Sequence, residues 1–333
     1  MLSDLVLGIV FVIEMGVGIV GNFFLLCQYT FTLFTSHRLR PIEYIYVHLT
    51  LANSKVLLSK GVPQTIVWFG FKNFLDPVGC KLIIYLQNVA RSVSLSITCL
   101  LSGFQVISIS PNNSRWTDLK VQAPKHIASS CFICWYYYLL IHFTLLGTMH
   151  NSRYISNDTR IWHLGYCSIS TPASFNASLF TIVFSIPDVM CMGFMIWASA
   201  YLVVLLHRHH QQVQYIHSSQ ISSKTYPEKR ATYAILLLVS TYVSFYSINS
   251  SLSFYLFRLN EYHSCLLATS HLLAAWFPAI SPFVLIFCDS QILKYLWTLW
   301  HRNTVPSQSP AQHPTPILRE ANLSETSRRE QEL

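Results

Sequence analysis

Seven long apolar runs constrain this chain more than any other feature of its sequence. They lie at residues 5–34, 42–70, 80–109, 124–146, 178–206, 231–257 and 265–288. A helix needs about 20 predominantly apolar residues to cross a hydrocarbon core of ~30 Å, so each run is long enough to span a bilayer. Only helices satisfy their own backbone hydrogen bonds in lipid at this segment length. The sequence therefore predicts an all-α membrane protein, a seven-transmembrane helix bundle.

The composition excludes several classes of protein. Of the 333 residues, 52% are hydrophobic and only 11% are charged, whereas a soluble domain carries about 25% charged residues. The formal net charge of +8 is scattered between the apolar runs rather than gathered on one basic face, which argues against a nucleic-acid-binding protein. The sequence contains no GxSxG, HExxH or P-loop motif. We therefore predict no enzymatic activity, no cofactor and no metal site.

The distribution of Lys and Arg predicts how the bundle is oriented. Cytoplasmic loops of membrane proteins carry an excess of these residues. The loops after the second, fourth and sixth runs carry four of them, at Lys72, Arg153, Arg160 and Arg258. The loops after the first, third and fifth runs carry nine, at Arg38, Arg40, Arg115, Lys120, Lys125, Arg208, Lys224, Lys229 and Arg230. We therefore expect the N-terminus outside, the C-terminus in the cytoplasm and a multi-pass protein of the plasma membrane.

The chain changes character after the seventh run. A short amphipathic helix on the inner leaflet is predicted at 290–301, because apolar side chains recur with helical spacing at Leu293, Leu296, Trp297 and Trp300. Residues 303–333 are rich in Pro, Ser, Gln, Thr and Glu, which is typical of disordered segments. We therefore expect a transmembrane domain at 1–302 and a disordered cytoplasmic tail at 303–333.

The predicted topology assigns roles to the cysteines and the glycosylation sequons. Cys80 begins the third run on the outer side, and Cys167 lies in the long loop between the fourth and fifth runs. Both face an oxidising compartment, so we predict a disulfide between them and leave the other cysteines unpaired. In the same outer loop, Asn157 is the main expected glycosylation site, and Asn176 is a second sequon that adjoins the membrane.

Four charged residues lie deep inside the predicted spans. They are Glu14, Lys60, Arg91 and Asp188. At 1.5 Å per helical residue, each lies about 14–16 Å below the outer end of its run. An ionisable side chain in lipid is costly and is usually functional or paired. A polar pocket in the outer half of the bundle and a set of ion pairs that holds the bundle together both explain this layer, and a proton relay is a third interpretation. Arg91 with Asp188 is the favoured pair.

Neutral polar residues accompany the charged layer. Gln87 and Asn88 share one face of the third run with Arg91, and His271 lies slightly higher in the seventh run. The amides of Asn22 and Asn53 lie in the inner halves of the first two runs, where such groups hydrogen-bond between helices. The residues predicted to bind a ligand in the outer half are Gln87, Asn88, Arg91, Asp188 and His271.

Several longer motifs resemble one known family. They are GN (21–22), HLTLAN (48–53), LLSKGVPQT (57–65), CLLSGFQVISISP (99–111), GYCS (165–168), PDVMCMGFMIWAS (187–199), LHRHHQQVQYIH (206–217), PEKRATYAILLLVSTYVSFY (227–246) and FPAISPFVLIF (277–287). Together they resemble the vomeronasal type-1 receptors, a branch of the G-protein-coupled receptors. The chain departs from the commoner rhodopsin-like pattern: Gln105 lies near the place of the acid-Arg-aromatic triplet, and the seventh run carries Ser281-Pro282 instead of Asn-Pro-x-x-Tyr.

The resemblance implies a chemosensory receptor. Its ligand would be a small pheromone-like molecule, its partners the lipid bilayer and a heterotrimeric G protein of the Gi/o class. A bitter-taste-like receptor is the nearest alternative, and a membrane transporter that uses the buried charges is a further one. Ion uptake and ligand-evoked nucleotide exchange on a G protein would distinguish a transporter from a receptor.

Overall fold

The structure is a computed structural model of the whole chain. It describes residues 2–36, 39–71, 73–111, 114–148, 150–151, 159–163, 166–172, 177–216, 225–259, 264–288 and 292. The chain divides into two units, 1–290 and 291–333, and the account below concerns the first. The predicted helix at 290–301, the tail at 303–333 and both outer-loop sequons lie outside the described residues, apart from residue 292.

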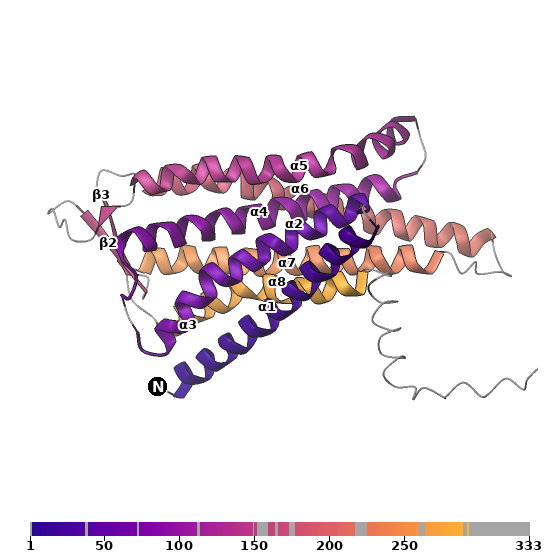
Figure 1. Cartoon of the computed structure of the whole chain (residues 1–333). Coiled ribbons are helices and arrows are strands. Elements are labelled where there is room, and N and C mark those ends of the chain that lie inside the picture. Colours follow the sequence, from indigo (N-terminus) through magenta and orange to yellow (C-terminus); the bar gives the residue numbers. More distant parts are fainter. Residues whose placement is uncertain are drawn as a thin grey trace, which may run out of the picture. The chain divides into compact units, whose positions relative to one another are not determined.

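Long helices lie side by side along most of the described chain (Figure 1). They are α1 (Leu2–Ser36), α2 (Pro41–Val56), α3 (Val62–Trp68), α4 (Pro77–Ile109), α5 (Ser114–Thr148), α6 (Ala177–Ile216), α7 (Thr225–Leu259) and α8 (Ser264–Cys288). Six of the described helices are long and apolar enough to cross a membrane. The predicted all-α membrane bundle is confirmed.

The second predicted span is helical but irregular. A π-helical turn, η1 (Leu57–Gly61), joins α2 to α3. The residues that flank η1, Val56 and Val62, have right-handed helical backbone angles. The helix therefore continues from Pro41 to Trp68 through the wide turn. With 16 residues, α2 is not among the six long helices, and the seventh span at this segment stays a prediction of the sequence.

Two helices extend further than the hydropathy predicted. Helix α5 begins at Ser114 instead of 124, and α6 continues to Ile216 instead of ending near 206. The predicted loop after the third run is therefore mostly helical. Hydropathy marks only residues that suit the hydrocarbon layer, whereas a helix can continue into water with polar residues such as Lys120 and Gln211.

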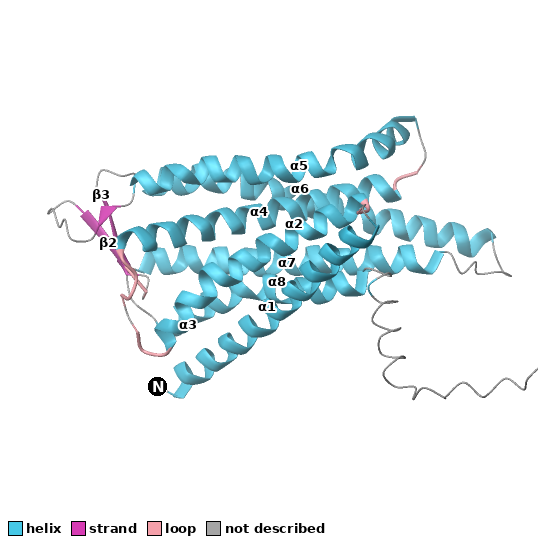
Figure 2. Cartoon of the chain, in the orientation of Figure 1, coloured by secondary structure: helices cyan, strands magenta, loops and turns pink. Residues whose placement is uncertain are grey.

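A small sheet lies between α5 and α6, where only a loop had been expected. Its antiparallel strands are β1 (His150–Asn151), β2 (Thr159–His163) and β3 (Ser168–Pro172), in the order β1-β3-β2. Figure 2 shows β2 and β3 at one end of the helices. We call it the disulfide end, because Cys167, just before β3, forms a disulfide there with Cys80. The strands read Thr-Arg-Ile-Trp-His and Ser-Ile-Ser-Thr-Pro and are rich in β-branched and aromatic residues, which favour strands.

Local chemistry sets where two helices begin. Pro77 occupies the first turn of α4, and the Asp76 carboxylate accepts hydrogen bonds from the backbone N–H groups of Val78 and Gly79. At the start of α2, the Glu43 carboxylate accepts from the backbone N–H and the guanidinium of Arg40, at 2.6 and 2.8 Å. Such caps satisfy N–H groups that have no partner inside the helix.

Amide hydrogen bonds join the helices near the middle of the bundle. Asn53 donates to Ser281 on α8 and accepts from Ser94 on α4, at 2.7 and 2.6 Å. Asn22 on α1 donates to the backbone carbonyl of Pro278 at 2.8 Å. Pro282 has no N–H to give to that carbonyl, so the Asn22 amide takes the place of the missing helical hydrogen bond. The predicted interhelical role of both amides is confirmed.

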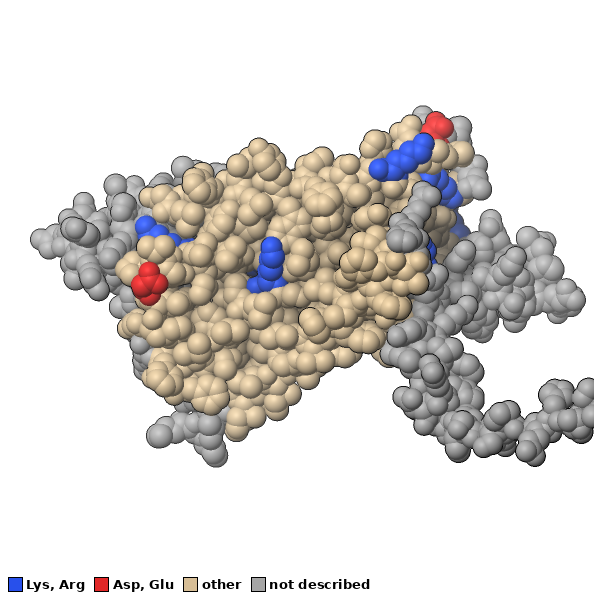
Figure 3. Space-filling view, in the orientation of Figure 1, with Lys and Arg blue, Asp and Glu red and all other residues tan. Residues whose placement is uncertain are grey.

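The outer surface of the bundle suits lipid. Figure 3 shows the sides of the helices covered almost wholly by uncharged residues, with Lys, Arg, Asp and Glu gathered chiefly at the two ends. Many large apolar side chains are exposed there, among them Phe23, Phe132, Phe143 and Met190. Exposed Lys55 on α2 lies over the ring of Trp135 on α5, 4.5 Å from its centroid, which is a favourable place for a cation beside an aromatic ring.

Candidate functional site

Three helices bring one basic, one acidic and one phenolic side chain together in the interior of the bundle. Arg91 on α4 donates to Asp188 on α6 at 3.0 Å and to the Tyr246 hydroxyl on α7 at 2.7 Å. Tyr246 in turn donates to the same Asp188 oxygen at 2.5 Å. Each member therefore bonds to both of the others. We call these three residues the arginine triad.

The arginine triad leaves its arginine partly accessible. The Asp188 side chain is 5% exposed and the Arg91 side chain 39%. The other Asp188 oxygen is buried without a hydrogen-bond partner. The planar guanidinium also lies near the face of the Tyr246 ring, 5.4 Å from its centroid. The arrangement neutralises the charge pair inside the membrane while Arg91 keeps donors that a further acceptor can reach.

The predicted pairing of Arg91 with Asp188 is confirmed. Tyr246, which lies in the motif YVSFY, was not predicted. The signal was present, because Tyr242 and Tyr246 lie four residues apart on one face of the helix. In the structure their rings stack at 5.9 Å, and Tyr242 also meets Phe277 of α8 edge-on at 4.2 Å.

A small cavity adjoins the arginine triad. Its volume is about 40 Å³, and it lies between α2, α4, α7 and α8. Polar groups from Arg91, Ser94, Tyr246 and Asn249 line it, together with the apolar and aromatic side chains of Val56, Tyr242, Phe245, Leu273, Ala274, Phe277 and Pro278. A drug-sized ligand needs a pocket of about 300–1,000 Å³, so this cavity has room only for a few molecules the size of water in the conformation described here.

A histidine lies on the α5 side of the same region. His142 is buried, and its Nε2 is 3.1 Å from the Ser92 hydroxyl on α4. Its ring stacks against Tyr138 and against Phe184 of α6, at 6.0 and 5.3 Å. These contacts give α5 a polar and an aromatic link to the helices of the arginine triad.

The structure divides the five predicted ligand-binding residues. Arg91 and Asp188 are in the arginine triad, but the amide of Asn88 donates to the Ile84 carbonyl of its own helix at 2.9 Å. Gln87 is half-buried on α4 and is not among the described residues that line the cavity. His271 also lies off the cavity wall, and the charge of Lys60 acts on it.

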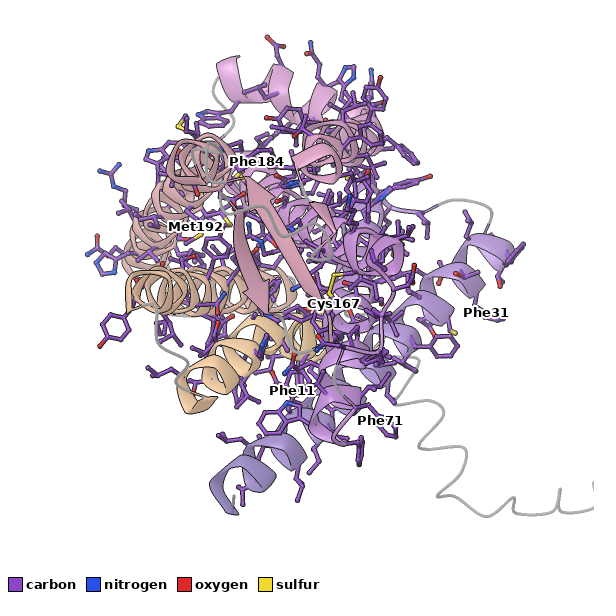
Figure 4. The ribbon with its side chains drawn as sticks, turned by 90° about the vertical axis from the view of Figure 1, so that its left-hand side faces the viewer. Phe11, Phe31, Phe71, Cys167, Phe184 and Met192 are labelled. Carbon is purple, nitrogen blue, oxygen red and sulfur yellow. A yellow bond between two sulfur atoms is a disulfide. The ribbon has the colours of Figure 1, made fainter. Side chains whose placement is uncertain are left out.

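The disulfide end of the bundle is tied together covalently. Cys80 at the start of α4 and Cys167 just before β3 form a disulfide, with their Cα atoms 6.0 Å apart, as predicted. Both are buried with Tyr166 and Ile84 in one apolar cluster. Figure 4 looks along the helices from this end and shows the strands crossing the bundle beside Cys167. Burial raises the pKa of Tyr166 to about 12, so the docked phenol is uncharged.

The other described cysteines lie on helices. Among those whose side chains the structure describes, Cys27, Cys99, Cys131, Cys134 and Cys191 are unpaired. Cys191 lies 3.7 Å from the Ser96 hydroxyl. Among the described residues, no group of three or more His, Cys, Asp or Glu side chains has a geometry that could hold a metal ion.

Comparison with known proteins gives a consistent result. Residues 5–298 match the family described as the vomeronasal organ pheromone receptor family. Vomeronasal type-1 receptor 1 of Homo sapiens is 41% identical over 298 residues, which cover 90% of this chain and 84% of that protein. Vomeronasal type-1 receptor 4 of Pongo pygmaeus is 42% identical over 286 residues, 86% of this chain and 95% of that protein. Olfactory receptor class A-like protein 1 of Danio rerio is 29% identical over 286 residues, 86% and 90% of the two chains.

Proposed function

Because this chain belongs to the vomeronasal type-1 receptor family, we propose that it detects a small pheromone-like molecule and activates a G protein of the Gi/o class. The chain is a multi-pass receptor of the plasma membrane. The observation that carries the proposal is the arginine triad, a partly accessible guanidinium next to a cavity inside the bundle. The proposed ligand contacts Arg91 first, as its main polar anchor, and reaches Gln87, Asn88, Asp188 and His271 only after the cavity has enlarged.

The proposed orientation puts the disulfide end outside the cell. Disulfides form in oxidising compartments, and the excess of Lys and Arg lies in the loops at the opposite end. Glycosylation of Asn157 tests this orientation. We expect Asn157→Gln to remove most of the glycosidase-sensitive shift in mass, with Asn112→Gln, in the proposed cytoplasmic loop, as the matched control. An unchanged shift in the Asn157 variant would contradict the orientation or the choice of sequon.

Ligand binding must enlarge the cavity, because about 40 Å³ is too small for such a molecule. The ligand shifts the population of conformations only if it binds the open arrangement better than the closed one. An acceptor group on the ligand that takes a hydrogen bond from Arg91 would compete with Asp188 and Tyr246. Since those residues lie on α6 and α7, this competition loosens the hold of α4 on both helices.

The proposed surface for the G protein lies at the end opposite the strands. Helices α5 and α6 extend past their apolar runs there. The cations Arg115, Lys120 and Arg208 lie on these extensions, and Lys125 lies at the adjoining end of the run in α5. Movement of α6 and α7 against α4 would change the spacing of this basic surface. The prolines Pro187 in α6 and Pro278 in α8 interrupt the helical hydrogen bonding and provide points of flexing.

The experiment is a screen of small volatile and steroidal compounds on the expressed full-length receptor, read as nucleotide exchange on purified Gi/o, Gs and Gq proteins. We expect a ligand-dependent signal on Gi/o alone. Arg91→Met should abolish the response, whereas Lys55→Met, which removes a lipid-facing cation elsewhere, should keep it. A ligand response on Gs or Gq only would contradict the coupling, and ion uptake without nucleotide exchange would favour a transporter.

A further inference from the structure

Buried polar atoms without partners also occur outside the arginine triad, on α1, α3 and α8. They include both carboxylate oxygens of Glu14 on α1, Oε1 of Gln64 and Nε1 of Trp68 on α3, and Nδ1 of His271 on α8. Most buried polar groups in proteins have a hydrogen-bond partner, so each exception calls for an explanation such as a bound water or ligand. The Gln64 side chain is deeply buried, at 6% exposure.

Close packing brings these residues together. Phe11 and Met15 on α1, Leu57 on η1 and Ala275 on α8 form one buried apolar cluster, against which Trp68 packs. Glu14 lies one residue before Met15, and His271 lies four residues before Ala275, on the same face of α8. Met15 also covers Gly61 of η1 so closely that any side chain at position 61 would overlap its terminal methyl.

The π-helical turn η1 supplies the basic member of the cluster. Lys60 lies within η1, four residues before Gln64, which in turn lies four residues before Trp68. Lys60 lies within electrostatic range of Glu14 and Arg91. The imidazole of His271 in turn lies within range of Lys60. Neither Glu14 oxygen hydrogen-bonds to Lys60, however, because both are without a partner. π-helical turns inside α-helices often mark functional sites.

We propose that Glu14, Lys60, Gln64, Trp68 and His271 form a second polar site inside the membrane, which binds hydroxyl groups. We call it the α1–η1–α8 site. The hydroxyl group belongs either to water or to the polar end of a small amphiphilic molecule. Binding of an amphiphilic molecule rests on the proposed chemosensory function, whereas binding of water does not.

The chemistry of the site selects a hydroxyl over a charged group. Lys60 and the Trp68 indole only donate hydrogen bonds, whereas the free oxygen of Gln64 only accepts, and the carboxyl group of Glu14 offers acceptor oxygens in either protonation state. A hydroxyl donates and accepts at once, so it can bridge the two kinds of group. A carboxylate would be repelled by Glu14, and an ammonium by Lys60 and the nearby Arg91.

The first experiment asks whether the site holds water. Radiolytic hydroxyl footprinting of the full-length receptor in lipid nanodiscs oxidises buried side chains only where water lies beside them. Met15 and Met195 are both buried, at 4% and 0% exposure, and only Met15 adjoins the site. We expect Met15 to be oxidised well above Met195 in the unmodified receptor. In the doubly substituted Glu14→Leu, Lys60→Met receptor, oxidation of Met15 should fall to the rate of Met195.

The second experiment asks whether an external hydroxyl binds there. The probe is an octanol that carries a diazirine, compared with its methyl ether, and the crosslinked peptides are mapped. Crosslinks to α1, η1 or α8 that form with the alcohol but not with the ether would show that a ligand hydroxyl enters the site. Fast oxidation of Met15 without such crosslinks supports the site with water as its occupant.

Equal oxidation of Met15 and Met195 in the unmodified receptor, with no alcohol-specific crosslink, would overturn the proposal. This result does not require any variant to fold. It would also leave the proposed function standing, because ligand-evoked nucleotide exchange through Arg91 is measured separately.

Discussion

The arginine triad and the α1–η1–α8 site lie at a similar distance along their helices but differ in how their charges are satisfied. In the triad, one guanidinium, one carboxylate and one phenol bond to one another. In the α1–η1–α8 site, the carboxyl group of Glu14 makes no hydrogen bond to Lys60 or to any other described group. The comparison indicates that buried polar side chains can have two different roles in one bundle. A closed triad fixes the relative positions of three helices, whereas an open cluster keeps its hydrogen-bonding capacity for something else.

The largest expected effect concerns the closed triad. Removal of one partner from a buried ion pair leaves the other charge uncompensated and typically costs about 3–5 kcal/mol. We expect Arg91→Ala and Asp188→Ala each to lower surface expression severely, measured by labelling of intact cells. Equal expression of both variants and the unmodified receptor would show that the triad does not hold the bundle.

A charge swap refines that test. The double variant Arg91→Asp, Asp188→Arg should recover part of the lost expression, because a double-mutant cycle isolates the interaction between the two side chains. Recovery of expression without signalling would assign the pair a structural role. Strictly additive losses would mean that the two charges do not interact.

A smaller loss is expected for the phenol of the triad. Tyr246→Phe removes one hydroxyl that both accepts from Arg91 and donates to Asp188, and leaving such groups less satisfied costs about 1–3 kcal/mol. The melting temperature of the purified receptor should fall while ligand potency changes. The matched control is Tyr255→Phe on the same helix, an exposed phenol for which no change in melting temperature is expected.

The smallest effect is expected in the open cluster. Glu14→Gln replaces a carboxyl group that makes no hydrogen bond, so the unfolding free energy should change by no more than about 0.5 kcal/mol, or rise. The melting temperature of the purified variant, measured beside Asp188→Asn, checks this directly. A destabilisation as large as that of Asp188→Asn would contradict the contrast between the two sites.

The sequence predicted the architecture because hydropathy alone defines where helices cross a membrane. It also predicted the pairing of Cys80 with Cys167 and of Arg91 with Asp188, since topology and depth restrict the partners. Depth does not fix how each helix is rotated, however. Rotation decides that Tyr246 completes the triad, that Asn88 bonds to its own helix and that Glu14 misses Lys60. The strands were not predicted because the position of β3 depends on contacts made by residues far away in the sequence: Tyr166 and Cys167, which directly precede β3, contact Leu75 and Cys80.

The π-helical turn η1 decides which face the second span presents to α1. A π turn accommodates one residue more than an α turn, whereas each residue of a regular α-helix turns the chain by about 100°. The wide turn therefore absorbs one residue, and the part of the span after it keeps the face that it would have in an uninterrupted α-helix one residue shorter. If η1 closed into an ordinary α-helix without losing a residue, everything after it would turn by about 100° relative to α2, and Gln64 and Trp68 would face away from α1. The second span would remain as apolar as before, but it would no longer bring these two side chains to the α1–η1–α8 site.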